Sequence, residues 1–201
     1  MRLYLATAPA SEPLIALDLR DHLRIDIDDE ETLIETYITA ARMLLEERLS
    51  IAMLTQTWDL FLDEWPSGNV IYLPRPPLQT VSYVKYYNTS NVATTLAAAA
   101  YHVDSYSKPA RIALNDGYDW PTTTLRAING VQVGFVAGYG ATGTAVPAPL
   151  LQAMKLIIGD LFENREQSVF AQGMHVTSLP FGVDALVRSY NMRSDLVLRQ
   201  K

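Results

Sequence analysis

The spacing of apolar residues changes twice along the chain, and this change constrains the fold more than any other feature. Between residues 33 and 49, apolar residues recur at intervals of three and four, which is the spacing of one face of an α-helix. From Thr55 to Leu62 the period becomes two, as in a half-buried strand. Helical spacing returns at residues 150–162. The sequence therefore predicts an α+β fold in which a β-rich segment is inserted between helices.

The N-terminal helical region is predicted at residues 17–49, after a loose start through Pro13. Leu19 and Leu23, four residues apart, indicate a short first helix. Asp28 is positioned to cap a longer helix, because acidic residues favour the positive end of the helix dipole. The stripe expected to be buried on this helix consists of Leu33, Ile34, Tyr37, Ile38, Ala41, Leu44 and Leu45, and the residues expected to stay hydrated are Glu35, Arg42, Glu46 and Glu47.

The β-rich segment is predicted at residues 55–137, with most of its strands antiparallel. After the first strand, further strands are expected at residues 70–73, 80–87, 101–103, 111–114 and 131–136. Pro74, Pro76 and Pro77 end the second strand, since proline cannot donate to a sheet ladder. Residues 97–100, four consecutive alanines, are compatible with either helix or loop.

A second large helix is predicted at residues 149–166, where Pro147 and Pro149 suit the start of a helix. Its apolar stripe is expected to pack on the stripe of the earlier helix, so that the two helices bracket the sheet. Residues 1–167 would then form one domain and residues 168–201 a C-terminal arm. The arm contains a short amphipathic helix at 183–192, which needs a docking surface on its own domain or on another chain, because so short a helix is marginal alone.

Charge is distributed unevenly along the 201 residues. The net charge is −6, but residues 1–64 contain 14 acidic and 5 basic residues. No basic stripe typical of a sequence-specific DNA-binding protein is present. The chain contains no cysteine, which excludes disulfides and thiolate metal sites. It contains no segment with the features of a signal peptide and no run of about 20 apolar residues, so we expect a mature start and no membrane span.

Residues Gly138–Gly143 spell the pattern G-x-G-x-x-G after a predicted strand, as in a dinucleotide-binding turn. In such a site, however, the helix begins within the motif so that its amides face the pyrophosphate. Here residues 146–149 intervene, and two of them are prolines. The favoured interpretation is a flexible, hinge-like loop between strand and helix, with no cofactor.

Catalytic and metal-binding patterns are weak throughout. His22, His102 and His175 are far apart and lack a partner at metal-ligand spacing. Residues 26–30 alternate like a calcium loop, but Glu31 stands where such a loop requires glycine. No nucleophile, base and orienting residue form a recognisable set. We therefore expect no catalytic residues, no bound metal and no enzymatic activity.

A set of short segments in a fixed order resembles the head-tail connector (adaptor) family of long-tailed phages, which includes versions carried by prophages and gene transfer agents. The resemblance covers residues 14–192. The segments are Leu23-Arg24-Ile25-Asp26, the helix centre from Ala40-Ala41-Arg42 to Glu46, Thr55-Gln56-Thr57-Trp58, Asp63-Glu64-Trp65-Pro66, Leu73-Pro74-Arg75-Pro76-Pro77, Val136-Ala137-Gly138-Tyr139-Gly140, Val146-Pro147 with the helix that follows, Glu163-Asn164-Arg165-Glu166 and Leu179-Pro180-Phe181-Gly182-Val183.

The resemblance implies a structural role in the neck of a virion or phage-like particle that is assembled in the bacterial cytoplasm. Members form a ring, usually twelve-fold, beneath the portal protein, and present their other face to a stopper or tail-completion protein. DNA passes through the ring without sequence-specific binding. The C-terminal part of members commonly engages the portal, which assigns portal binding here to Val183, Leu186, Val187, Arg188, Tyr190, Arg193, Arg199 and Lys201.

Two alternatives remain open at the level of sequence. A tail-completion or stopper protein of the same assembly would also form a ring but would bind the adaptor instead of the portal. A nucleotide-dependent enzyme would use the loop at Gly138–Gly143.

Overall fold

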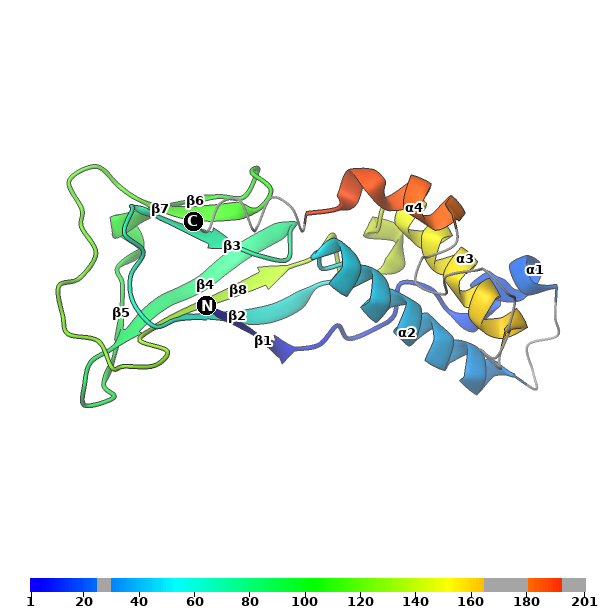
Figure 1. Cartoon of the computed structure of the whole chain (residues 1–201), viewed down its shortest axis with the longest axis horizontal. Helices are drawn as coiled ribbons and strands as arrows, with labels where there is room; N and C mark the ends of the chain where they lie inside the picture. Colours follow the sequence, from blue (N-terminus) through cyan, green and yellow to red (C-terminus); the bar gives the residue numbers. More distant parts are fainter. Residues whose placement is uncertain (25–29, 165–180, 193–201) are drawn as a thin grey trace, which may run out of the picture.

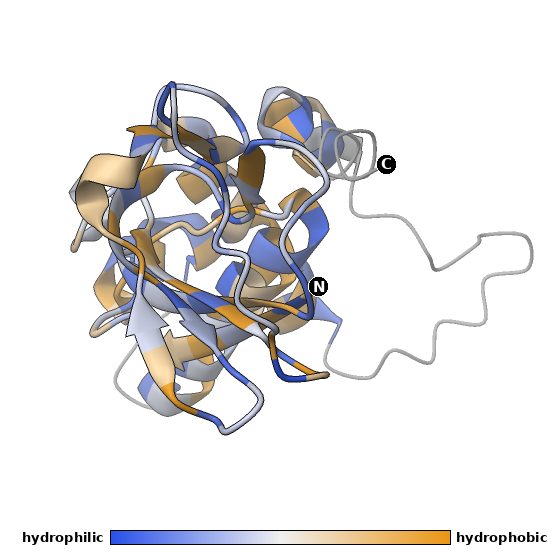
Figure 2. Ribbon diagram, turned by 90° about the vertical axis from the view of Figure 1, so that its left-hand side faces the viewer, coloured by the Kyte–Doolittle hydropathy of each residue, from blue (hydrophilic) through white to orange (hydrophobic). Residues whose placement is uncertain are grey.

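The structure is a computed structural model that describes residues 1–24, 30–164 and 181–192. The molecule is elongated, with strands gathered at one end and helices at the other (Figure 1). We refer to these two parts as the β lobe and the helical lobe. Figure 2 looks along the long axis from the side of the β lobe, so that the helices lie behind the sheets.

The β lobe contains two antiparallel sheets. The larger has the strand order β1-β2-β8-β4-β5, and the smaller has the order β3-β7-β6. Strands of the larger sheet are β1 (Arg2–Thr7), β2 (Gln56–Leu62), β8 (Val131–Ala137), β4 (Leu78–Tyr87) and β5 (Ala93–Thr95), and those of the smaller are β3 (Val70–Leu73), β7 (Ala110–Leu114) and β6 (Tyr101–Asp104). The alanine segment that sequence left open forms a 3-10 helix, η2 (Ala98–Ala100).

The core of the β lobe is built from residues of both sheets. Leu60 on β2 pairs with Val133 on β8, so the two side chains share a face of the larger sheet, and both are fully buried. Ile112 on β7 is buried in the same cluster. The apolar side chains that alternate with polar ones along these strands therefore lie on the face of the larger sheet that packs against the smaller sheet.

The helical lobe is built around α3 (Ala148–Glu163), which contacts α2 (Glu31–Leu49) and α4 (Phe181–Val187). Shorter elements complete it: α1 (Arg20–Leu23) and the 3-10 helices η1 (Ala16–Leu19), η3 (Gly143–Ala145) and η4 (Arg188–Tyr190). Ile34 and Ile38 of α2 share one core with Leu150 and Met154 of α3. The predicted packing of the two stripes is confirmed except at Leu44, which is 46% exposed. The α+β class is confirmed.

The expectation that the two helices bracket the sheet is wrong. Both helices lie at the same end of the molecule (Figure 1), because their apolar faces cover each other. The residues between the sheets form a second, separate core. The β-rich segment, which lies between the two helices in the sequence, thus forms a separate lobe at one end of the helix pair.

The N-terminal segment was expected to be loose through Pro13, but residues 2–7 form β1 and pair with β2. Five of these six residues are exposed. An edge strand in which only Leu3 is partly buried has no alternation to detect, which is why periodicity missed it. The short β5 was missed for the same reason, since its three residues are all exposed.

Helix boundaries differ from the predicted ones by a few residues. The last large helix spans 148–163 instead of 149–166, and the arm helix begins at residue 181 and continues as η4 to residue 190. The predicted cap Asp28 and the calcium-like segment 26–30 lie mainly in residues 25–29, outside the described residues.

Candidate assembly surface

The arm helix α4 packs on the chain's own helical lobe. Val183 and Val187 are 0% and 3% exposed and belong to the same core as Leu150 and Met154 of α3. Leu186 and Tyr190 are partly buried against this core. The amphipathic face that the sequence predicted is therefore real, and in this chain its docking surface is its own domain.

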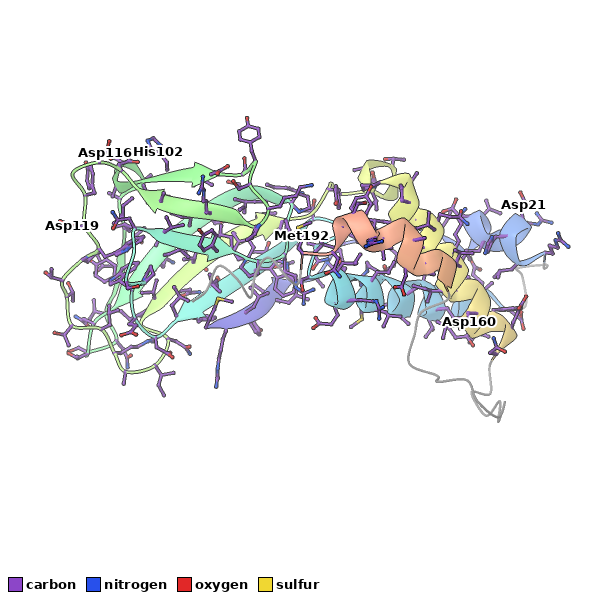
Figure 3. All side chains as sticks on the ribbon, turned by 45° about the horizontal axis from the view of Figure 1, so that its top comes forward. Asp21, His102, Asp116, Asp119, Asp160 and Met192 are labelled. Atoms are coloured by element: carbon purple, nitrogen blue, oxygen red, sulfur yellow. The ribbon has the colours of Figure 1, made fainter. Side chains whose placement is uncertain are left out.

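Two polar contacts hold the described part of the arm, one at Asp184 and one at Met192. Asp184 of α4 accepts a hydrogen bond from the Arg48 guanidinium of α2 at 3.0 Å. The backbone N–H of Met192 donates to the carbonyl of Leu49 at 3.0 Å, which satisfies one of the carbonyls that a helix C-terminus leaves free. Figure 3 shows Met192 between the two lobes, so the described part of the arm reaches their junction.

The end of the arm lies beside the loop that carries the glycine pattern. Tyr190 and Met192 line a cavity of about 60 Å³ together with Tyr139 and Pro77. Burial, with a smaller contribution from Tyr190, raises the pKa of Tyr139 to about 12. The cavity is far smaller than the roughly 300–1,000 Å³ of small-molecule sites.

A buried charge network joins α2 to the segments around it. The Arg42 guanidinium donates to Glu12 at 2.6 and 3.0 Å and to Glu46 at 2.8 Å. Burial disfavours its charge, but the hydrogen bonds and charges of the two carboxylates outweigh this effect and raise the pKa of Arg42 above its ordinary value. The other carboxylate oxygen of Glu46 accepts from the backbone N–H of Met53 and from Gln56.

The expectation that Arg42 and Glu46 stay hydrated is therefore wrong. They are only 8% and 7% exposed, because the N-terminal segment and the start of β2 cover this flank of α2. The sequence did carry a signal, since an Arg and a Glu four residues apart on a helix form a favourable pair. Nothing in periodicity indicated that Glu12, 30 residues earlier, completes it.

The glycine loop is a packed junction and not the flexible hinge that sequence predicted. The Gly138 N–H donates to Pro77, and the Gly140 carbonyl accepts from Thr55. Gly138 has φ +129°, and a Cβ there would collide with the Leu54 carbonyl. A Cβ on Gly143 would collide with the Pro13 carbonyl. These close backbone approaches account for the glycines in physical terms.

The residues considered for chemistry remain apart. His22 lies on α1 and His102 on β6, in different lobes, while His175 lies outside the described residues. Figure 3 shows His102, Asp116 and Asp119 at the outer end of the β lobe and Asp21 and Asp160 at the opposite end. Among residues 1–24, 30–164 and 181–192, no three His, Asp or Glu side chains are grouped to hold a metal ion. No helix within these ranges is long and apolar enough to cross a membrane.

Comparison with known families identifies the family of this chain. The sequence profile of the phage gp6-like head-tail connector proteins matches residues 17–116. The chain belongs to the phage head-tail connector family. Its role is accordingly structural, as a connector of a phage-like particle. No curated protein matches the sequence.

Solved structures extend the connector likeness over almost the whole chain. A chain from the neck of an empty gene transfer agent particle, computed with C6 symmetry, is 28% identical with a TM-score of 0.79. A chain from the neck of the native particle, computed with C12 symmetry, is 27% identical with a TM-score of 0.76. In both cases the match covers 95% of this chain and 95% of the other.

The structure places the residues predicted to bind the portal as follows. Val183 and Val187 are buried within the chain, Leu186 and Tyr190 are partly buried, and Arg188 is exposed on η4. Arg193, Arg199 and Lys201 lie outside the described residues. Of the apolar residues of the predicted portal face, Val183 and Val187 are thus engaged within the chain itself.

Proposed function

We propose that this connector forms a ring in the neck of a phage or gene-transfer-agent-like particle, where it joins the portal to a stopper or tail-completion protein. The observation that carries the proposal is the 95% coverage in both directions of chains from gene transfer agent necks with C12 and C6 symmetry. The ring is twelve-fold in this proposal. The protein has no catalytic role in it.

The body of the connector, residues 1–167, would form the wall of the ring around the DNA exit channel. Residues 1–64 carry 14 acidic against 5 basic residues. Most of the acidic residues that the structure describes in this range lie in the helical lobe. An acidic surface repels the phosphate backbone, so DNA would pass without being held. This charge balance supports a channel and opposes a DNA-binding role.

The C-terminal arm, residues 168–201, is proposed to engage the portal. Arg188 is exposed, and Arg193, Arg199 and Lys201 continue a basic stretch. Leu186 and Tyr190 are partly exposed beside it, whereas Val183 and Val187 would anchor the arm to α3. Val183 and Val187 would thereby fix the position of the exposed Arg188 relative to the body.

Electron microscopy of the connector mixed with isolated portal rings tests the proposal. We expect a second ring of density stacked on one face of the portal. Binding to an isolated adaptor ring, with none to the portal, would instead establish the tail-completion or stopper role and overturn the portal assignment.

A matched pair of variants tests the arm. Arg188→Glu reverses an exposed charge on the arm, and Arg2→Glu reverses an exposed charge on β1, far along the chain. We expect Arg188→Glu to reduce co-sedimentation with portal rings by at least tenfold and Arg2→Glu to leave it unchanged. Equal behaviour of the two variants would remove Arg188 from the portal contact.

A further inference from the structure

The helical lobe exposes two pairs of large apolar side chains. Within its described residues, the most exposed large hydrophobic side chains are Ile15, Leu17, Met43 and Leu44, which are 46–64% exposed. We call Met43, Leu44 and the neighbouring exposed Ala40 the α2 patch, and Ile15 with Leu17 the η1 patch. Grouped apolar exposure of this kind is typical of an interaction site.

The α2 patch is part of a helix face that carries no charge between Thr36 and Leu44. Thr36, Ala40 and Met43 follow one another at helical spacing and are all exposed, opposite the buried Ile34 and Ile38. Glu47, which continues this face toward the helix end, is already engaged by the Arg75 guanidinium. A helix face kept in water normally carries charges, whereas depletion of charge marks the centre of a protein interface.

The η1 patch and Leu44 of the α2 patch lie on opposite flanks of α2, and Met43 lies on the outward face between these flanks. On one flank, Thr39 and Arg42 bind Glu12, which leads directly into the η1 patch. On the other flank, Arg48 binds Asp184 of α4. Leu44 stands one helical turn before Arg48 and therefore belongs to the α4 side. One copy of the chain thus presents two unlike apolar patches in two different directions.

A closed ring requires two unlike contact surfaces on each copy. In a cyclic assembly of more than two copies, each subunit uses two different surfaces, one for each neighbour, and like surfaces never meet. We propose that the α2 patch of one copy packs against the η1 patch of the next copy around the ring. This proposal rests on the ring of the proposed function and identifies the subunit contact within it.

Cysteine cross-linking tests the contact, because the chain contains no cysteine of its own. The double variant Leu17→Cys with Leu44→Cys, assembled with portal rings and treated with a short bismaleimide, is expected to give a ladder of covalent oligomers up to the complete ring. An equal mixture of the two single variants is expected to stop at dimers. Each single variant alone is expected to stay monomeric.

The control replaces one member of the pair. Gln152 is exposed on α3 and outside both patches. The double variant Leu17→Cys with Gln152→Cys should therefore give no ladder. A ladder no stronger than this control would overturn the patch assignment, as would dimers from Leu44→Cys alone, since these require like patches to meet.

A charge variant gives an independent readout. Ala40→Arg places a cation in the α2 patch at a solvent-exposed helix position, and Gln152→Arg adds the same charge elsewhere. We expect Ala40→Arg to lose closed rings in electron micrographs with a melting temperature close to the original, and Gln152→Arg to retain them. Closed rings of Ala40→Arg would refute the proposed contact while leaving the ring intact. Absence of rings from the unmodified chain on portals would refute the proposed function as well.

Discussion

The side-chain amide of Gln56 on β2 donates a hydrogen bond of 2.5 Å to the carboxylate of Glu46 on α2, and both residues are buried. The same carboxylate binds Arg42, which in turn binds Glu12. One helix residue therefore ties the N-terminal segment, α2 and the first strand of the insertion together. In a connector, this network fixes how the β lobe projects from the helical lobe.

Removing one member of this network should strongly destabilise the connector. Glu46→Ala leaves Arg42 with one carboxylate instead of two and the Met53 N–H without its partner. Arg42 stays paired with Glu12, so the loss comes from the buried Met53 N–H and Gln56 amide, and a buried donor left without a partner costs about 1–3 kcal/mol. Urea denaturation should show this loss in the free energy of unfolding. The control is Glu35→Ala, at an exposed position of the same helix, whose free energy of unfolding should stay within about 0.5 kcal/mol of the original. A loss below about 1 kcal/mol for Glu46→Ala would contradict this role.

The arm should be held mainly by burial and only weakly by its surface ion pair. Val183 is fully buried, so Val183→Ala should lower the free energy of unfolding by about 1–3 kcal/mol. The Arg48 and Asp184 side chains are 40% and 48% exposed, and exposed pairs contribute at most about 1 kcal/mol. Asp184→Asn should therefore have the smaller effect in thermal denaturation. The reverse order would show that the ion pair is what holds the arm.

Sequence alone was sufficient for the elements that bury one face. The stripes of α2 and α3 and the strands β2, β4 and β8 were predicted because burial imposes a period of 3.6 or two on the side chains. Leu44 shows the limit of this reasoning. It follows the helical spacing but lies in solvent in the single chain, since periodicity detects an apolar face and not what covers it.

Other features depend on contacts between distant residues and were not accessible from local patterns. β1 pairs with β2 through its backbone, and Glu12 reaches Arg42 across 30 positions. The arm helix was predicted, but its docking surface was left open between its own domain and another chain. That choice depends on the space beside α3, which is filled by Val183 and Val187.

The hairpin between β6 and β7 should respond to pH in the acid range. The side chain and backbone of Ser107, followed by Arg111 and the Tyr106 N–H, donate hydrogen bonds to Asp104 and lower its pKa from the ordinary 3.8 to about 2. Because the folded-state pKa is lowered, the stabilisation is complete above the ordinary value and is lost as the pH falls through about 2. The amide signals of Tyr106 and Ser107 should therefore titrate by NMR with a midpoint near 2. A midpoint near 3.8, or the same titration in Asp104→Asn, would contradict this assignment.

Gly138 provides the sharpest test of whether the glycine loop packs or binds a nucleotide. Gly138→Ala should destabilise the connector by at least about 1–3 kcal/mol, because φ is +129° and a Cβ would collide with the Leu54 carbonyl. Gly68→Ala is the matched control, since a Cβ there meets nothing within 4 Å. Neither NAD nor ATP should raise the melting temperature of the unmodified chain, whereas a ligand bound only to the folded state would do so. If a nucleotide raised the melting temperature of the unmodified chain but not that of Gly138→Ala, the loop would be a nucleotide-binding site. A loop that only packs would bind no nucleotide in either protein.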